Sequence, residues 1–176
     1  MRKNENNFAY IDGANLYRGI MGLGWELNYR RFRVWLREKY AVQTAYLFIG
    51  LIPKYKELYR YLQETGFTLV YKEVVYDGDG KAKGNCDADL VLNIVRDAYE
   101  EKFDKAVIVS SDGDFAGLIA FLKERSRLLV VLSPHPKEKC SILIKRTGAP
   151  ISYIHDQRTI LSRTQKEKVP DGDGTP

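Results

Sequence analysis

Residues 105–124 read KAVIVSSDGDFAGLIAFLKE, and this stretch decides the fold. Its first seven residues, 105–111, form a short apolar run that is typical of a buried strand. A helix is expected from Asp114 to Glu124, directly after the acidic turn Asp112-Gly113-Asp114. A buried strand that leads straight into a helix is the building unit of a parallel sheet covered by helices.

The same alternation of strand and helix patterns continues on both sides of this stretch. Hydrophobic spacing predicts strands at 8–11, 41–51, 67–76, 127–133 and 150–154. It predicts helices at 29–39, with Asn28 as N-cap, from Pro53 to Gly66, at 87–101 and at 138–146. The pair Asp12-Gly13 is read as a turn after the first strand, and 77–85 as a loop. The chain is therefore predicted to be an α/β protein whose mostly parallel central sheet carries helices on both faces.

Composition and length describe one ordinary globular domain. We expect a single domain over residues 1–162, followed by a disordered polar tail over 163–176. No apolar run is long enough to span a membrane, and the N-terminal residues MRKNENNF do not resemble a secretory signal. The two cysteines, Cys86 and Cys140, have no metal-type partners nearby, so a reduced cytoplasmic protein is expected.

The net charge of +5 is distributed unevenly along the chain. Residues 137–168 contain eight Lys and Arg against three Asp and Glu, which equals the whole surplus. A mild basic excess is compatible with a polyanionic partner, and equally with a solvated basic surface.

Three aspartates follow two of the predicted strands. Asp12 ends the first strand, and Asp112 and Asp114 follow the strand at 105–111. In parallel α/β sheets the working site lies at the carboxyl ends of the strands, so these carboxylates are candidates for one site. The alternative is that Asp-Gly serves only as a turn pair and that Asp caps the following helix.

The helix predicted from Asp87 contributes a fourth carboxylate. Asp87 lies in line with the apolar stripe of this helix, whereas Asp89 falls nearly opposite and Asp97 lies toward the polar side. A carboxylate at the head of a core-facing stripe points toward the edge of the sheet. The alternative is that Asp87 is only the N-cap, and Asp89 could still reach the site from the first turn.

Carboxylates that converge at one edge repel one another unless a cation lies between them. Oxygen ligands without nearby His or Cys favour Mg²⁺ or Mn²⁺ over zinc. Asn15 could orient a ligand or a water molecule, and Ser110 and Ser111 place hydroxyl groups at the same edge. Lys72, Lys81 and Lys83 could bind substrate phosphates, or could simply be solvated loop charges.

Three segments resemble the NYN domain, in the LabA-like group of the PIN-like nuclease superfamily. They are IDGANL (11–16), KGNCDADLVLNIVRDA (83–98) and VIVSSDGDFAGLIAFLK (107–123), in the order and spacing of the family. The resemblance implies a three-layer PIN-like (Rossmann-like) fold with an acidic pocket that binds Mg²⁺ or Mn²⁺, and metal-dependent ribonuclease activity. Carried over by motif, the catalytic and metal-binding residues are Asp12, Asp87, Asp112 and Asp114, with Asn15 beside them. Asn85-Cys86 departs from the small or β-branched residue common at that point.

The leading functional hypothesis is therefore hydrolysis of phosphodiester bonds in single-stranded RNA; the choice of RNA rests on the resemblance. The alternatives are a non-catalytic nucleic-acid or protein-binding module that kept the fold, and another metal-dependent transferase or phosphatase. A dinucleotide-binding enzyme is disfavoured because no GxGxxG follows the first strand. Catalysis by histidine is disfavoured because His135 and His155 have no recognisable partner set. The sequence leaves homo-oligomerisation open.

Overall fold

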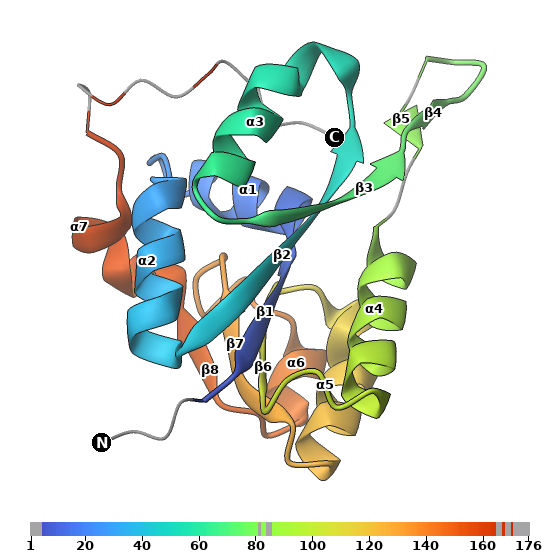
Figure 1. The fold of residues 1–176 in the computed structure, drawn as a ribbon, viewed down its shortest axis with the longest axis vertical. Coiled ribbons are helices and arrows are strands. Elements are labelled where there is room, and N and C mark those ends of the chain that lie inside the picture. The colour runs from blue at the N-terminus through green and yellow to red at the C-terminus, as the bar shows by residue number, and fades with distance from the viewer. Residues whose placement is uncertain (1–4, 81, 84–85, 165–166, 168–169, 171–176) are drawn as a thin grey trace.

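A six-stranded parallel sheet forms the centre of the molecule (Figure 1). The computed structural model describes residues 5–80, 82–83, 86–164, 167 and 170. The sheet has the order β3-β2-β1-β6-β7-β8. Its strands are β1 (Asn7–Asp12), β2 (Val42–Leu51), β3 (Thr68–Glu73), β6 (Ala106–Val109), β7 (Leu128–Ser133) and β8 (Ile151–Tyr153). The strand order reverses between β1 and β6, and this switch point is where such folds bind ligands.

Helices cover both faces of the sheet, which confirms the predicted α/β class. One face packs against α1 (Gly13–Met21), α2 (Tyr29–Tyr40), α3 (Lys56–Glu64) and α7 (Arg158–Leu161). The other face packs against α4 (Asp87–Tyr99), α5 (Ala116–Glu124) and α6 (Ile142–Arg146). Three short 3₁₀ helices complete the described elements: η1 (Pro53–Tyr55), η2 (Gly113–Phe115) and η3 (Ile154–Gln157).

The central strand β1 shows why the sheet is buried on both sides. All six of its residues are buried. Because side chains alternate along a strand, Ala9 and Ile11 enter the core beneath α1 and α2, and Phe8 and Tyr10 enter the core beneath α4 and α5. Each fully buried large apolar side chain contributes about 1.5–3 kcal/mol, so β1 is anchored from two sides.

The helix α1 differs from the sequence-based prediction of a turn at Asp12-Gly13. A nine-residue helix begins at Gly13 itself, and Asp12 caps it by accepting a hydrogen bond from the Asn15 backbone N–H. Asn28 caps α2 in the same way, as predicted, with its Oδ1 accepting from the Arg31 N–H. In both cases the residue before the helix satisfies a backbone donor that the helix itself cannot pair.

The segment after β3 is a hairpin rather than one long strand followed by a loop. The sheet strand stops at Glu73, and β4 (Val75–Tyr76) pairs antiparallel with β5 (Ala82–Lys83). Val75 and Tyr76 are exposed, so no core holds this segment in the main sheet. The hairpin projects beyond β3 and leads into α4 (Figure 1).

The C-terminal part also differs from prediction in detail. Helix α6 begins only at Ile142, because the Ser141 side chain caps it and the preceding N–H groups of Lys139 and Cys140 both donate to the Pro136 carbonyl. The short elements η3 and α7 were not predicted. The domain limit at Ser162 stays a prediction, since most of the tail lies outside the described residues; Arg163 and Glu167, which are described, contact Glu26 and Arg31. No helix in the described ranges could cross a membrane.

Candidate active site

The candidate site lies where the carboxyl ends of β1 and β6 meet. The two strands run parallel and side by side, with Ile11 paired to Val109 near their carboxyl ends. Asp12 ends β1, and Ser110, Ser111 and Asp112 follow β6. The switch point of the sheet therefore delivers the two predicted acidic motifs to one edge.

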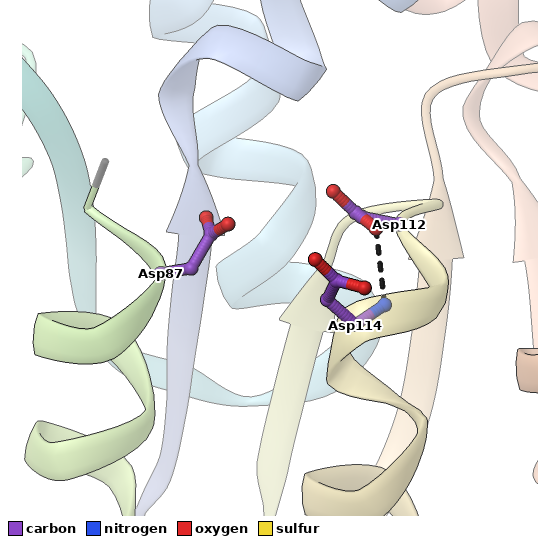
Figure 2. Close-up of side chains that lie close together, drawn as sticks. All are labelled: Asp87, Asp112 and Asp114. Carbon is purple, nitrogen blue, oxygen red and sulfur yellow. Dashed lines mark hydrogen bonds between the residues drawn. The ribbon is translucent and has the colours of Figure 1, made fainter. Parts of the chain in front are cut away.

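Three carboxylates converge at this edge, and we call Asp87, Asp112 and Asp114 the acidic trio. Each contributes an oxygen, and these oxygens lie within 4.8 Å of one another. Figure 2 shows Asp87, from the start of α4, facing Asp112 and Asp114 across the gap between α4 and η2. Asp112 is fixed as the N-cap of η2, because its Oδ1 accepts from the Asp114 N–H at 3.0 Å.

Asp87 is not the N-cap of its helix. That position belongs to Cys86, which makes no side-chain capping bond, and Asp87 is the first helical residue. Asp89 instead forms an ion pair with Lys72, with 3.1 Å between Asp89 Oδ2 and Lys72 Nζ. The first turn of α4 thus sends one carboxylate into the acidic trio and pairs the other with a lysine from β3.

Asp12 is not part of the acidic trio, because its carboxylate oxygens do not lie within 4.8 Å of all three of those side chains. Its side chain is only 8% exposed, and both oxygens accept hydrogen bonds, Oδ1 from the Asn15 N–H at 3.0 Å and Oδ2 from Ser110 Oγ at 3.3 Å. Burial raises the pKa of Asp12, and the nearby Asp87 carboxylate raises that pKa further. The fold therefore holds a carboxylate in place where its charge is costly.

The glycines beside the aspartates are required by close packing rather than by turn conformation. A Cβ on Gly13 would lie 2.7 Å from the Phe48 carbonyl oxygen, and one on Gly113 would lie 2.5 Å from Ser141 Oγ. Neither glycine has a positive φ. Gly13 thus allows β2 to pack closely against the site, and Gly113 allows the segment before α6 to do so.

A hydrogen-bonded network on the β7 side was missed by sequence reasoning. Ser111 Oγ lies 2.6 Å from His135 Nδ1, and both the N–H and the hydroxyl of Ser111 donate to Asn15 Oδ1, at 2.9 and 3.0 Å. The expectation that His135 lacks partners was therefore wrong. Its position just past β7, at the same edge of the sheet as Asp12 and Asp112, was the available signal. His155, also expected to lack partners, accepts from Trp25 Nε1 on the other face.

Comparison with known proteins identifies the family of the chain. Residues 9–151 match the NYN domain, and this match spans most of the chain. The chain belongs to the NYN domain family. NYN domains are part of the PIN-like nuclease superfamily, so the chain carries a nuclease-like domain.

Two relatives extend the comparison of this NYN domain. The low amplitude and bright protein LabA of Synechococcus elongatus is 26% identical over 169 residues, which are 89% of this chain and 88% of LabA. A crystal structure of a protein of unknown function from Vibrio parahaemolyticus superposes with a TM-score of 0.74 at 22% identity. The match covers 92% of this chain and 99% of that one, and it supports the fold.

The donor set of this NYN domain fits a hard divalent cation. Carboxylate oxygens are the preferred ligands of Mg²⁺ and Mn²⁺, and two oxygens on one Mg²⁺ lie about 3 to 4 Å apart. The spacing within the acidic trio, up to 4.8 Å, is close to this value, so small side-chain rotations or a water molecule would complete the site. Cys86, where the sequence departs from the family, packs against the core of α4 and α5, and burial raises its thiol pKa to about 11. It therefore acts as a small apolar residue.

The predicted substrate lysines are not all available. Lys72 is held by Asp89, as described above. Lys81 lies outside the described residues, and for Lys83 the structure describes the backbone only, in β5. The outcome for Lys72 is thus the one that the structure describes, and the roles of Lys81 and Lys83 stay predictions.

The basic segment 137–168 divides between two places. Its first part carries Lys145 and Arg146 on α6, which packs beside η2 and hence beside the acidic trio. The segment is tied there by the Ser141 N–H, which donates to the Ser111 carbonyl at 3.2 Å. Its last part lies near the start of α2, where Glu167 pairs with Arg31 at 2.9 Å and Arg163 pairs with Glu26, just before the helix, at 2.7 Å. Among the described residues of this segment, those of the first part adjoin the acidic trio.

An apolar groove of about 430 Å³ opens next to the acidic trio. It runs between α4 and η2 and is lined by Asp87, Ala88, Val91, Leu92, Val95, Asp114 and Phe115. Leu92 is 63% exposed, so this wall is unusually apolar for a surface. The groove gives the site an uncharged wall beside its carboxylates.

Proposed function

We propose that this chain is an Mg²⁺- or Mn²⁺-dependent endoribonuclease that hydrolyses phosphodiester bonds in single-stranded RNA. One observation carries the proposal: in a chain of a nuclease-like family, three carboxylates converge within 4.8 Å at the switch point of the sheet. Such a cluster is electrostatically unfavourable by itself and becomes favourable around a divalent cation.

Each aspartate has a role that follows from its position. Asp87 and Asp112 would hold the ion from opposite sides of the gap, directly or through water. Asp114, the most exposed of the acidic trio, would orient the attacking water or hold a second ion. Asp12 would orient waters from behind, since its own oxygens are already fixed by Asn15 and Ser110. A bound ion would supply polarisation of the phosphate and a lower pKa for the attacking water.

The surroundings suit a single-stranded polyanion. The apolar groove could accommodate an unpaired base next to the phosphate at the acidic trio. Lys145 and Arg146 on α6, which packs beside η2, would bind flanking phosphates, and Lys145 Nζ also donates to the Lys137 carbonyl. A base in a duplex is stacked and paired and so could not enter this groove, which favours single-stranded substrate.

Cleavage of labelled single-stranded RNA tests the proposal. We expect Mn²⁺ or Mg²⁺ to support internal cleavage, EDTA to abolish it, and Asp112→Asn to lower the rate at least about a hundredfold, because a ligand carboxylate is lost. Asp89→Asn is the matched control, since Asp89 lies on the same turn as Asp87 but outside the acidic trio, and it should retain cleavage.

Two results would contradict the proposal. One is cleavage that survives EDTA or Asp112→Asn unchanged. The other is binding of RNA without cleavage in either metal, which would instead indicate a non-catalytic binding module.

A further inference from the structure

The orientation of the Asn15 amide is fixed by its neighbours. The backbone N–H of Ser111 can only donate, and it points at the Asn15 side chain at 2.9 Å, so the atom that faces it must be Oδ1. The Ser111 hydroxyl donates to the same oxygen at 3.0 Å. Both lone pairs of Oδ1 are therefore used, and Oδ1 has none left for a metal ion.

The other end of the amide keeps some contact with solvent, although Asn15 as a whole is only 9% exposed. Asn15 Nδ2 makes no hydrogen bond to any residue that the structure describes. Tyr40 Oη is the only buried side-chain polar atom without a partner in the described ranges, so Nδ2 must be accessible to water. An oriented and accessible N–H₂ group at this edge can donate hydrogen bonds to an anion and cannot bind a cation.

His135 reinforces this orientation through the Ser111 hydroxyl. The Ser111 hydroxyl has one hydrogen, and its bond to Asn15 Oδ1 uses that hydrogen. The 2.6 Å contact between Ser111 Oγ and His135 Nδ1 must then be a hydrogen bond donated by Nδ1–H. The histidine is itself held in place, because Ser133 Oγ donates to its carbonyl at 2.7 Å.

Two basic side chains, Arg18 and Lys139, act electrostatically on His135. Lys139 and Arg18 both act to lower the pKa of His135, and Arg18 also opposes, without cancelling, the raised pKa of Asp12. Burial is the first cause of the lowered pKa of His135, so the imidazole is neutral near neutral pH. Basic side chains near His135 favour the binding of a phosphate oxygen at this end of the site.

We propose that His135 is a positioning residue which, through Ser111, aims the Asn15 amide at a non-bridging phosphate oxygen of the substrate. The inference rests on the proposed function for the identity of the substrate. It makes Asn15 a substrate-binding donor on the β7 side of the site, opposite the apolar groove on the α4 side.

The tautomer of His135 provides a test that needs no activity. Nitrogen-15 NMR of the full chain in EDTA should show the neutral Nδ1–H form at about pH 7, whereas free histidine favours Nε2–H. Single-stranded RNA added in EDTA should shift the side-chain amide signals of Asn15. An Nε2–H tautomer, or Asn15 signals that stay in place when RNA binds, would overturn the proposal.

Variants at His135 separate positioning from folding. Asparagine can offer an N–H where Nδ1 stands, so His135→Asn should keep kcat within about threefold. His135→Ala and Ser111→Ala should each lower kcat about tenfold with the same melting temperature, and the double variant should lose no more than either one. Full activity in His135→Ala, or an equal loss in His135→Asn, contradicts the role of Nδ1–H.

The proposed function and this inference can fail separately. If the wild type does not cleave RNA yet shows the Nδ1–H tautomer and the Asn15 shifts, the nuclease proposal falls and the phosphate contact stands. If the wild type cleaves but the tautomer is Nε2–H, only the positioning role falls.

Discussion

At the scale of single residues, the site is built from polar groups that are fixed by hydrogen bonds. Asp12 accepts from Asn15 and Ser110, and Ser111 joins Asn15 to His135. The aspartates could be predicted from sequence because the rule about strand ends needs only the position of a strand. His135 could not, because its partner is decided by side-chain orientation between two strands that are separate in sequence.

Asp97, on α4, is a second residue whose contacts could not be predicted from the sequence. Its position on the helix predicts a polar face, yet it is 2% exposed. Its Oδ2 accepts from the hydroxyl of Tyr10 at 2.9 Å, and Lys102 pairs with Oδ1 at 3.2 Å. The buried hydroxyl of Tyr10 needs an acceptor, and Asp97 provides it. Because Tyr10 belongs to β1, the sequence pattern of α4 alone cannot predict this contact.

Replacing Asp12 should stabilise the metal-free protein while impairing its site. A raised pKa means that the folded state favours the neutral acid, so stability from this group is present at low pH and lost as pH rises through the folded pKa. Asp12→Asn should therefore increase the free energy of unfolding at about pH 7 in EDTA, and this gain should shrink at acidic pH, as the wild-type carboxyl becomes protonated. Urea denaturation at both pH values measures it.

With bound metal, we expect Asp12→Asn to be less stable than the wild type. Saturating Mn²⁺ should stabilise the wild type more than Asp12→Asn, because the ion relieves the repulsion between carboxylates. A variant that is less stable than the wild type at neutral pH in EDTA would refute the electrostatic account of Asp12.

At the level of helices and strands, close packing between distant segments explains the elements that local sequence patterns did not predict. Helix α1 was read as a turn because Gly13 follows Asp12, yet Gly13 is there to let the backbone of β2 approach. The strand predicted at 67–76 ends early because Val75 and Tyr76 find no core. The long buried strands and the helices α2 to α5 were predicted well, since their apolar periodicity is complete within each segment.

Two helical glycines provide a matched test of this packing. A Cβ on Gly19 in α1 would lie 2.6 to 2.9 Å from Pro134, including its backbone, whereas a Cβ on Gly117 in α5 meets nothing within 4 Å. Alanine gains about 1 kcal/mol of helix propensity at either place, but overpacking costs about 1–3 kcal/mol. Gly19→Ala should thus destabilise the fold by about 1 kcal/mol and displace the loop that carries His135, and Gly117→Ala should stabilise it by up to about 1 kcal/mol.

Thermal unfolding of both variants measures the difference. If Gly19→Ala were as stable as Gly117→Ala, the contact between α1 and the loop after β7 would not constrain the fold.

At the scale of the whole molecule, the charge of +5 conceals two features of opposite sign. The acidic trio lies at the switch point of the sheet, and Lys145 and Arg146 lie on the neighbouring α6. The distant part of the basic segment is bound to α2 through the ion pair of Glu167 with Arg31. The sequence predicts a parallel sheet but cannot give its strand order, and this order decides which charges become neighbours.

The central claim is that the acidic trio holds a divalent cation, and calorimetric titration with Mn²⁺ tests it most directly. The wild type should bind Mn²⁺, and Asp87→Asn and Asp112→Asn should each weaken binding at least about tenfold, because each removes a carboxylate from the site. Asp89→Asn, on the same turn of α4 but paired with Lys72, should bind as the wild type does. Equal affinity of the wild type and the Asp87 and Asp112 variants would contradict the account.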